Sequence, residues 1–228
     1  MALQGAEGAI KRAMDLCIAS VGLAAAVPLL LGVAGAVRAS MGSPVLYRQV
    51  RIGLGAKPFR LWKFRTMSNE RSPDGALLPD AERLTRLGRF LRETSLDELP
   101  QLLNVIAGEM SIVGPRPLLA RYIPRYSPRQ HLRHAVRPGI TGWAQINGRN
   151  SLGWDAKLEL DAWYAEHASL GLDLHIILRT VLLVLRREAV LSGAGAEMDE
   201  FWGAAGRPAG GPRAYPVEEN ESIQGGPI

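Results

Sequence analysis

The longest apolar stretch of the chain is Leu16–Val37, 22 residues without a charged side chain. A helix of that length measures about 33 Å, enough to cross the hydrocarbon core of a bilayer. Pro28 lies in its middle and removes a helical hydrogen bond, so the helix bends or breaks there. Basic residues flank both ends, so the positive-inside rule favours neither orientation. The pattern predicts a kinked span or a re-entrant helix that leaves on the face where it entered. A buried helix of a soluble protein is the alternative, and a cleaved signal peptide fits poorly.

The rest of the chain alternates short strand and helix patterns. Residues 45–50 and 59–64 read as strands joined by a glycine-rich turn. Helical patterns cover 81–92, 100–107, 127–136, 156–167 and 171–187. The last helix is nearly all apolar but too short to span a bilayer, so it lies at a membrane interface or in the core. We therefore expect an irregular α/β fold with a short antiparallel sheet and interfacial amphipathic helices, anchored by a bent re-entrant N-terminal helix.

Composition and charge divide the chain into three parts. Residues 192–228 hold eight glycines, four prolines, six acidic residues and two arginines. Such a segment cannot bury enough apolar surface to offset its ordering entropy. We expect a re-entrant membrane hairpin over 1–40, a folded domain over 41–191, and a mostly disordered tail over 192–228 in which Phe201 and Trp202 can still fold back. The whole chain carries +5, so residues 1–191 carry +9, and its single cysteine excludes a disulfide framework and a cysteine-built zinc site.

Two adjacent carboxylates, Asp97 and Glu98, precede a predicted helix. A capping box from Ser95 to Glu98 explains them as a helix start and nothing more. With Asp97 as the N-cap instead, Pro100 falls at the third helical position, where its missing N–H costs nothing. In either register both carboxylates lie at a helix N-terminus, where the helix dipole favours anions. The spacing leaves capping and catalysis open.

Cations and glycine–proline turns surround the carboxylate pair along the sequence. Lys63 and Arg65 end the second predicted strand, and segments 111–117 and 137–150 are dense in Gly, Pro, Arg and Asn. Such loops present side chains and amides to a ligand, or they only turn the chain and leave the arginines solvated.

Four motifs follow one another along the chain: KFRTM at 63–67, SLDELPQL at 95–102, VGPRP at 113–117 and PGITGW at 138–143. Together they resemble the bacterial sugar transferase family, the monotopic phosphoglycosyl transferases that begin cell-surface glycan assembly. The resemblance runs from about Lys11 to Val190, and the single N-terminal apolar segment resembles the small members of the family. The family's helix break is often a Ser-Pro pair, whereas this chain has Val27-Pro28.

The resemblance implies transfer of a sugar-1-phosphate from a nucleotide diphosphate sugar, usually a UDP sugar, to undecaprenyl or another polyprenol phosphate, with release of the nucleoside monophosphate. The family's Asp-Glu pair falls on Asp97 and Glu98 and works with Mg²⁺. The aspartate is the nucleophile that forms a covalent phosphosugar intermediate, so ping-pong kinetics follow. Asp161 matches a further acidic position near the metal or nucleotide. The resemblance also implies the bacterial inner membrane, with the active site on its cytoplasmic face.

Elementary chemistry is consistent with these roles. A carboxylate attacking phosphorus splits one hard step into two, and magnesium is held by one or two carboxylates plus substrate phosphates. Arginine forks clamp phosphate oxygens in pairs, and lysine acts as a compact point charge. We therefore expect Asp97 and Glu98 to be catalytic and to hold the metal. The expected substrate-binding residues are Lys63, Arg65, Arg116, Arg149 and Asp161.

Two other functions are open on the residues alone. A non-enzymatic, membrane-associated protein whose basic body binds anionic lipid or nucleic acid explains the charge, but it leaves the Asp-Glu pair and the loops unexplained. A lipid-diphosphate hydrolase would use the same magnesium and carboxylates with water as acceptor. We expect membrane lipid, and no nucleic acid, as a partner. An oligomer is possible, but the sequence specifies neither the oligomeric state nor the sugar.

Overall fold

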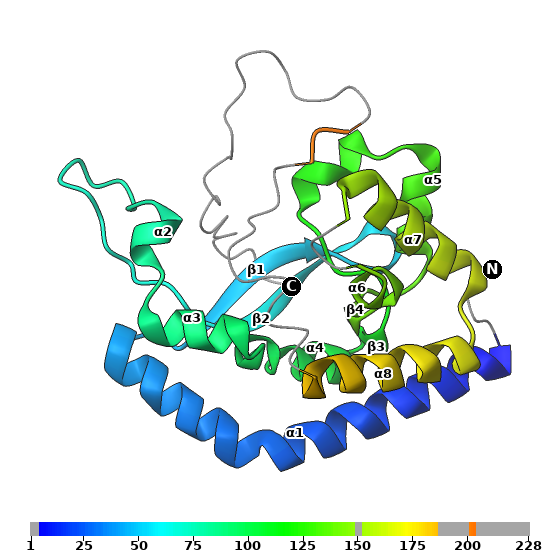
Figure 1. The fold of residues 1–228 in the computed structure, drawn as a ribbon, viewed down its shortest axis with the longest axis horizontal. Coiled ribbons are helices and arrows are strands. Elements are labelled where there is room, and N and C mark those ends of the chain that lie inside the picture. The colour runs from blue at the N-terminus through cyan, green and yellow to red at the C-terminus, as the bar shows by residue number, and fades with distance from the viewer. Residues whose placement is uncertain (1–4, 149–151, 187–200, 204–228) are drawn as a thin grey trace, which may run out of the picture.

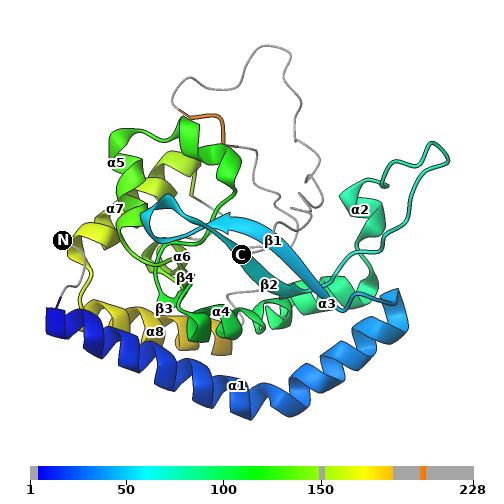
Figure 2. The same ribbon diagram turned by 180° about the vertical axis from the view of Figure 1, so that it is seen from behind.

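The computed structural model describes residues 5–148, 152–186 and 201–203. The α-helices are α1 (Gly5–Met41), α2 (Asp80–Arg83), α3 (Arg86–Glu93), α4 (Gln101–Ala107), α5 (Pro128–His131), α6 (Trp143–Ile146), α7 (Trp154–His167) and α8 (Leu170–Leu185). The strands are β1 (Leu46–Ile52), β2 (Pro58–Phe64), β3 (Ser111–Val113) and β4 (Gly139–Thr141). In both views α1, α8, α4 and α3 lie along one side of the molecule, the β1–β2 hairpin crosses its middle, and α5 and α7 lie toward the opposite side (Figures 1 and 2).

Helix α1 confirms the predicted apolar helix and extends it at both ends. It is long and apolar enough to anchor the chain in a membrane: its most apolar 18 residues have a mean hydropathy of 2.4, and 11% of them are buried. Pro28 lies inside the helix, and the ribbon bends near its middle into two arms (Figures 1 and 2). The missing N–H of Pro28 accounts for the bend. The arms form an open V and not a closed helical hairpin.

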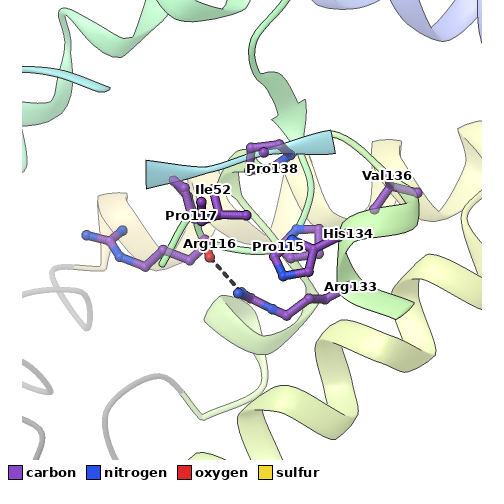
Figure 3. Close-up of a pocket in the computed structure, with 9 residues that line it drawn as sticks. Ile52, Pro115, Arg116, Pro117, Arg133, His134, Val136 and Pro138 are labelled. Atoms are coloured by element: carbon purple, nitrogen blue, oxygen red, sulfur yellow. Dashed lines mark hydrogen bonds between the residues drawn. The ribbon is translucent and has the colours of Figure 1, made fainter. Parts of the chain in front are cut away.

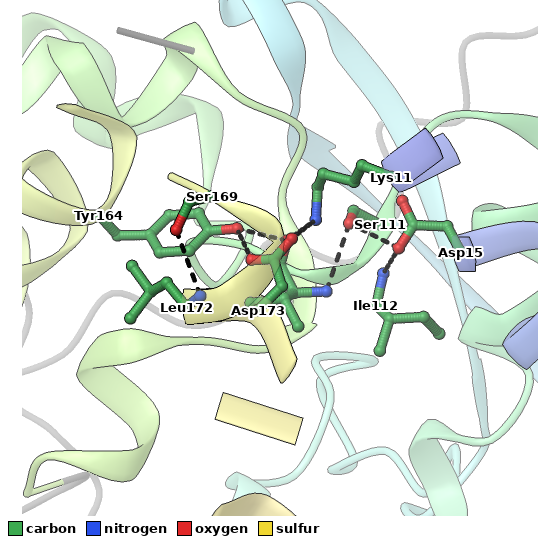
Figure 4. Close-up of polar contacts among 9 residues, drawn as sticks. Lys11, Asp15, Ser111, Ile112, Tyr164, Ser169, Leu172 and Asp173 are labelled. Carbon is green, nitrogen blue, oxygen red and sulfur yellow. Dashed lines mark hydrogen bonds and ion pairs between the residues drawn. The ribbon is translucent and has the colours of Figure 1, made fainter. Parts of the chain in front are cut away.

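The N-terminal arm of α1 is attached to the body by buried polar contacts (Figure 4). The Lys11 ammonium donates to Asp173 Oδ2 on α8 at 2.6 Å, and the Tyr164 hydroxyl donates to Asp173 Oδ1 at 2.6 Å. Asp15 Oδ1 accepts from the Ser111 hydroxyl and from the Ile112 amide on β3, each at 3.0 Å. Asp15 and Asp173 are almost fully buried, so these bonds join α1 to α8 and β3 away from water.

The C-terminal arm of α1 is attached to the same body at a second place. Val33 and Val37 pack in a cluster with Phe64 and Leu91. Where the helix ends, the buried Arg65 guanidinium donates to the carbonyls of residues 41, 42 and 43. Burial lowers the pKa of Arg65 below its ordinary value. Arg65 therefore satisfies the free carbonyls at the end of a helix, a role that the sequence analysis did not anticipate.

The predicted antiparallel hairpin is confirmed, with β1 paired to β2 from Leu46 opposite Phe64 to Ile52 opposite Pro58. A second sheet was not predicted: β3 pairs with β4 in parallel, Ser111 opposite Gly139 and Val113 opposite Thr141. These strands have three residues each and give too short a pattern to recognise in sequence.

Two predicted helices are broken in the structure. The segment 81–92 forms α2 and α3, because Thr85 caps a new helix by accepting a hydrogen bond from the Gly88 amide at 2.9 Å. The segment 127–136 forms α5 and a 3-10 turn, Leu132–Ala135. Helices 100–107, 156–167 and 171–187 are confirmed as α4, α7 and α8, with small shifts at their ends.

Helix α8 has two unlike faces, which bears on whether it is core or interfacial. Ile176 and Asp173 are fully buried against the body. The other face leaves large apolar side chains about half exposed: Leu174, Leu178, Val181, Leu182 and Val184. An amphipathic helix of this kind suits a membrane interface while it contributes to the core.

A short piece of the predicted tail packs on the body. Phe201 is 3% exposed and contacts the rings of Tyr122, Tyr126 and Trp154, with ring centroids 5.4–5.9 Å apart. Its carbonyl accepts a hydrogen bond from Arg125. The sequence analysis allowed Phe201 and Trp202 to fold back, and the structure shows both on the body, with Arg125 over the Trp202 ring at 4.7 Å. The disorder predicted for the tail concerns residues 192–200 and 204–228, which lie outside the described ones.

Candidate active site

The Asp97–Glu98 pair lies in a single 3-10 turn, Leu96–Glu98, between α3 and α4. Neither predicted cap forms. Ser95 adopts a left-handed conformation (φ 57°), makes no side-chain cap, and follows the last residues of α3 as a left-handed helix stop. Helix α4 begins later, with Pro100 as its N-cap residue. Neither carboxylate caps a helix, so helix capping does not explain why the pair is present.

Glu98 is held by two cations. Its Oε1 accepts from Lys63 Nζ at 2.7 Å and from Arg116 Nη2 at 2.5 Å, and its side chain is 17% exposed. Burial by itself raises the pKa of Glu98, but the charges of Arg116 and Lys63 outweigh that effect and hold the pKa well below its usual range. Glu98 therefore stays ionised and keeps both cations beside Asp97.

Asp97 is in a different state. The residue is 6% exposed, and among the described residues its carboxylate accepts no hydrogen bond and makes no ion pair. Burial raises the pKa of Asp97 above its ordinary value, and the charge of Lys63 partly opposes that shift. A buried carboxylate without donors is less stabilised than a solvated one, so its oxygens are poised to bind a cation or attack an electrophile.

Asn104 explains why Lys63 reaches Glu98. Its side chain is fully buried on α4, accepts from the Trp62 amide at 3.1 Å, and donates to the Arg60 carbonyl at 2.7 Å. These bonds fix β2 against the helix that follows the carboxylates. The sequence signal was available: Asn104 is a polar residue within the apolar run 102–106.

The glycines of the two predicted ligand loops hold the loops together. A Cβ atom on Gly139 would lie 2.1 Å from the Gly114 nitrogen, and one on Gly142 would lie 2.2 Å from the Gly114 carbonyl oxygen. Such distances exclude any side chain, so the two backbones are in direct contact. These glycines are therefore explained by close backbone packing and not by a ligand. Their contact places the loop that carries Arg116 beside Glu98.

A buried ion pair supports Arg116 from behind. Arg133 donates from Nη2 to Asp161 Oδ2 at 2.8 Å. The same nitrogen donates to the backbone carbonyl of Arg116 at 2.6 Å (Figure 3). Both side chains of this pair are nearly inaccessible to solvent. Asp161 therefore lies one side chain away from Arg116 and does not face the Asp97–Glu98 pair directly.

The other expected substrate residues divide as follows. The structure brings Lys63 and Arg116 together with Asp97 and Glu98. It places Arg65 at the end of α1, where backbone carbonyls occupy its guanidinium. Arg149 lies outside the described residues.

The carboxylate pair has donors that suit magnesium. Mg²⁺ prefers hard oxygen ligands, often one or two carboxylates with substrate phosphates and water. Asp97 has free oxygens, whereas Glu98 already shares its charge with Lys63 and Arg116. Within the described ranges no group of three acidic, His or Cys side chains could hold a metal alone. The site therefore fits an ion that takes its remaining ligands from a phosphate-bearing substrate.

Comparison with known proteins gives a consistent result. The model of the bacterial sugar transferase family matches residues 6–187. An uncharacterized sugar transferase of Bacillus subtilis, EpsL, is 50% identical over 195 residues, covering 86% of this chain and 96% of the relative. A UDP-glucose:undecaprenyl-phosphate glucose-1-phosphate transferase of Klebsiella pneumoniae is 42% identical over 194 residues. A UDP-N-acetylgalactosamine-undecaprenyl-phosphate N-acetylgalactosaminephosphotransferase of Aeromonas hydrophila is 36% identical over 195 residues.

The lengths of these relatives differ. The match with the Klebsiella protein covers 78% of this chain but 41% of that protein. The match with the Aeromonas protein covers 82% of this chain but 45% of that protein. The matched region contains the Asp97–Glu98 pair and its two cations. The chain belongs to the bacterial sugar transferase family, as a transferase of the phosphoglycosyl transferase kind.

Proposed function

We propose that the chain transfers a sugar-1-phosphate from a UDP sugar to undecaprenyl phosphate, with release of UMP, as a first membrane step of glycan assembly. The Klebsiella and Aeromonas relatives are named for transfers of this type. The observation that carries the proposal is the contrast between neighbouring carboxylates: Asp97 is buried without a partner, and Glu98 is locked between Lys63 and Arg116.

In the first step an Asp97 oxygen attacks the phosphorus that carries the sugar. The bond from that phosphorus to the bridging oxygen breaks, and its electron pair leaves on the nucleoside monophosphate. The Asp97 carboxylate is then bonded to the phosphorus that carries the sugar, as an acyl phosphate. The burial of Asp97 favours this step, because a poorly solvated carboxylate has less hydration to lose on attack.

In the second step a phosphate oxygen of undecaprenyl phosphate attacks the same phosphorus. The bond to Asp97 breaks and the carboxylate is restored, which leaves the sugar on a lipid-linked diphosphate. The nucleotide leaves before the lipid reacts, so the proposal predicts ping-pong kinetics.

Lys63 and Arg116 offset the charge of the incoming diphosphate. At 4 Å each pair of unit negative charges costs about 4 kcal/mol at an effective dielectric constant of 20, so two carboxylates alone would repel the substrate. Magnesium held by Asp97 and Glu98 would supply further neutralisation of the diphosphate. Glu98 orients the two cations in both steps.

The two attachments of α1 support a re-entrant placement at the inner membrane, with the active site on the cytoplasmic face. Lys11 binds Asp173 near one end of the helix, and Arg65 binds the carbonyls at the other, so both ends contact the same folded body. A helix that crossed the bilayer would separate these ends by about 30 Å of hydrocarbon. Cysteines introduced at the two ends should both be labelled from the cytoplasmic side, and protection of either end by an intact inner membrane would contradict this placement.

A panel of nucleotide sugars tests the reaction. Purified protein is incubated with each sugar, undecaprenyl phosphate and magnesium, and nucleoside monophosphate is measured. We expect sustained release with at least one UDP sugar only when the lipid acceptor is present. Sustained release of sugar-1-phosphate without the acceptor would indicate a hydrolase instead. The relatives use different sugars, so the panel includes both glucose and N-acetylgalactosamine.

A further inference from the structure

A small cavity of about 50 Å³ opens beside the Glu98 ion pairs. Its walls include Arg51, Lys63, Gln101 and Arg116. The hairpin register explains why the first two meet there. Arg51 is directly opposite Phe59, so their side chains share one face of the hairpin. Phe59 and Lys63 are four residues apart on β2 and therefore point to the same face, which brings Arg51 and Lys63 to one side. The volume exceeds what one water needs, so the cavity has room for a small polar group.

Arg51 has no counter-ion in this cavity. Its Nη2 donates to the neutral amide oxygen of Gln49 at 2.5 Å, and its buried Nε has no hydrogen-bond partner. Among the described residues it makes no ion pair with a carboxylate. Burial, followed by the charge of Arg116, lowers the pKa of Arg51 to about 10. Arg51 is partly buried and its Nε is fully buried without a partner, so an anion in the cavity would stabilise the guanidinium.

Gln101 adds a second unused group. It is 3% exposed at the start of α4, and within the described part of the chain its side-chain amide makes no hydrogen bond. The amide is on the cavity wall and is accessible from the cavity, so it is available to a polar group bound there.

The charges indicate the sign of that ligand. Lys63 and Arg116 lie beside two carboxylates, Asp97 and Glu98, and Arg51 adds a third cation, so the group carries an excess of one positive charge. We infer that Arg51 and Gln101, together with Lys63 and Arg116, form a subsite for a phosphate group next to the group that Asp97 attacks. This inference rests on the proposed function. The phosphate comes either from the nucleoside side of the donor diphosphate or from the polyprenol phosphate.

Thermal unfolding with inorganic phosphate tests the subsite without turnover. The protein in maltoside detergent is melted with phosphate or with chloride at equal ionic strength. The variants are Arg51→Gln and, as a control, Arg48→Gln, which removes the same charge from the opposite face of β1, where Arg48 stacks on Trp62 at 3.8 Å. We expect phosphate to raise the Tm of the wild type and the control but not of Arg51→Gln. Without phosphate, Arg51→Gln should melt at the same temperature as the wild type or higher.

Three results would overturn the inference: no phosphate shift in the wild type, a full shift in Arg51→Gln, or a lower Tm of Arg51→Gln without phosphate, which would mean a structural role.

The source of the phosphate follows from steady-state kinetics. Arg51→Gln should raise the KM for the nucleotide sugar or the KM for the polyprenol phosphate about tenfold to a hundredfold, according to which of them the subsite binds. Unchanged values for both contradict the inference. If the proposed function is wrong, the wild type itself shows no transfer, whereas its phosphate shift persists.

Discussion

Asp161 is expected to act through Arg133 and not on the substrate, and Asp161→Asn tests this role. The substitution keeps the shape of the side chain but leaves the Arg133 guanidinium, 2% exposed, without its carboxylate. Breaking a buried ion pair costs about 3–5 kcal/mol, because a desolvated charge remains. For a domain of this size 1 kcal/mol lowers Tm by about 2–4 °C, so the expected fall is about 6–20 °C. Since Arg133 also holds the Arg116 carbonyl, kcat should fall as well.

Thermal unfolding followed by circular dichroism measures this effect, together with the KM for the nucleotide sugar. Asp155→Asn is the control, because Asp155 is an exposed carboxylate on the same helix and its loss should leave Tm within about 1 °C. Replacing the pair by Arg133→Met with Asp161→Leu should recover most of the stability. An unchanged Tm in Asp161→Asn with a strongly raised KM would refute the reasoning, since that result means direct contact with the substrate.

Three further predictions concern pH and the anchor helix. Burial, and then the charges of Arg133 and His131, lower the pKa of His134 from 6.5 to about 4, so the fold should lose about 3 kcal/mol as the pH falls from 6.5 to 4. His134→Gln should make Tm nearly independent of pH between 6.5 and 4, whereas replacing the exposed His131 by Gln should leave the pH dependence in place. A wild-type Tm that does not change over this range would contradict the lowered pKa of His134. Arg65→Met should lower Tm without changing the KM for the nucleotide sugar, and a raised KM at constant Tm would restore Arg65 as a substrate ligand. Pro28→Ala should straighten α1 and make one end inaccessible to cytoplasmic labelling in part of the molecules; unchanged labelling would mean that Pro28 does not set the bend.

The features predicted well from sequence were those with a local period or a long run. The apolar segment around Pro28 predicted helix α1, and the alternating pattern of 45–50 and 59–64 predicted the β1–β2 hairpin. The Asp97–Glu98 pair with Lys63 and Arg116 was also expected, and the structure brings these four side chains together. The first two depend on neighbours in sequence, and the grouping of the four side chains followed the family motifs.

The errors arose where the role of a side chain depends on residues that are distant in sequence. Ser95 was one of two candidate helix caps, with Asp97 the other, but Ser95 follows α3 in a left-handed conformation and neither residue caps a helix. Lys63 and Arg65 looked equivalent at the end of a strand. Because β2 stops at Phe64, Lys63 stays on the sheet face toward Glu98, whereas Arg65 turns to the end of α1. No local pattern contains the information that these partners are 22 to 35 residues away.

The central claim is that Asp97 is a nucleophile, and the most direct measurement is covalent labelling. The protein is incubated with a nucleotide sugar labelled in the sugar, with magnesium and without lipid acceptor, and the labelled peptide is identified by mass spectrometry. We predict about one label per active site on Asp97, an equal burst of nucleoside monophosphate, and loss of the label when undecaprenyl phosphate is added. Asp97→Asn should acquire no label and should lose several orders of magnitude in turnover. Near-normal turnover of Asp97→Asn, or a label on another residue, would contradict the account.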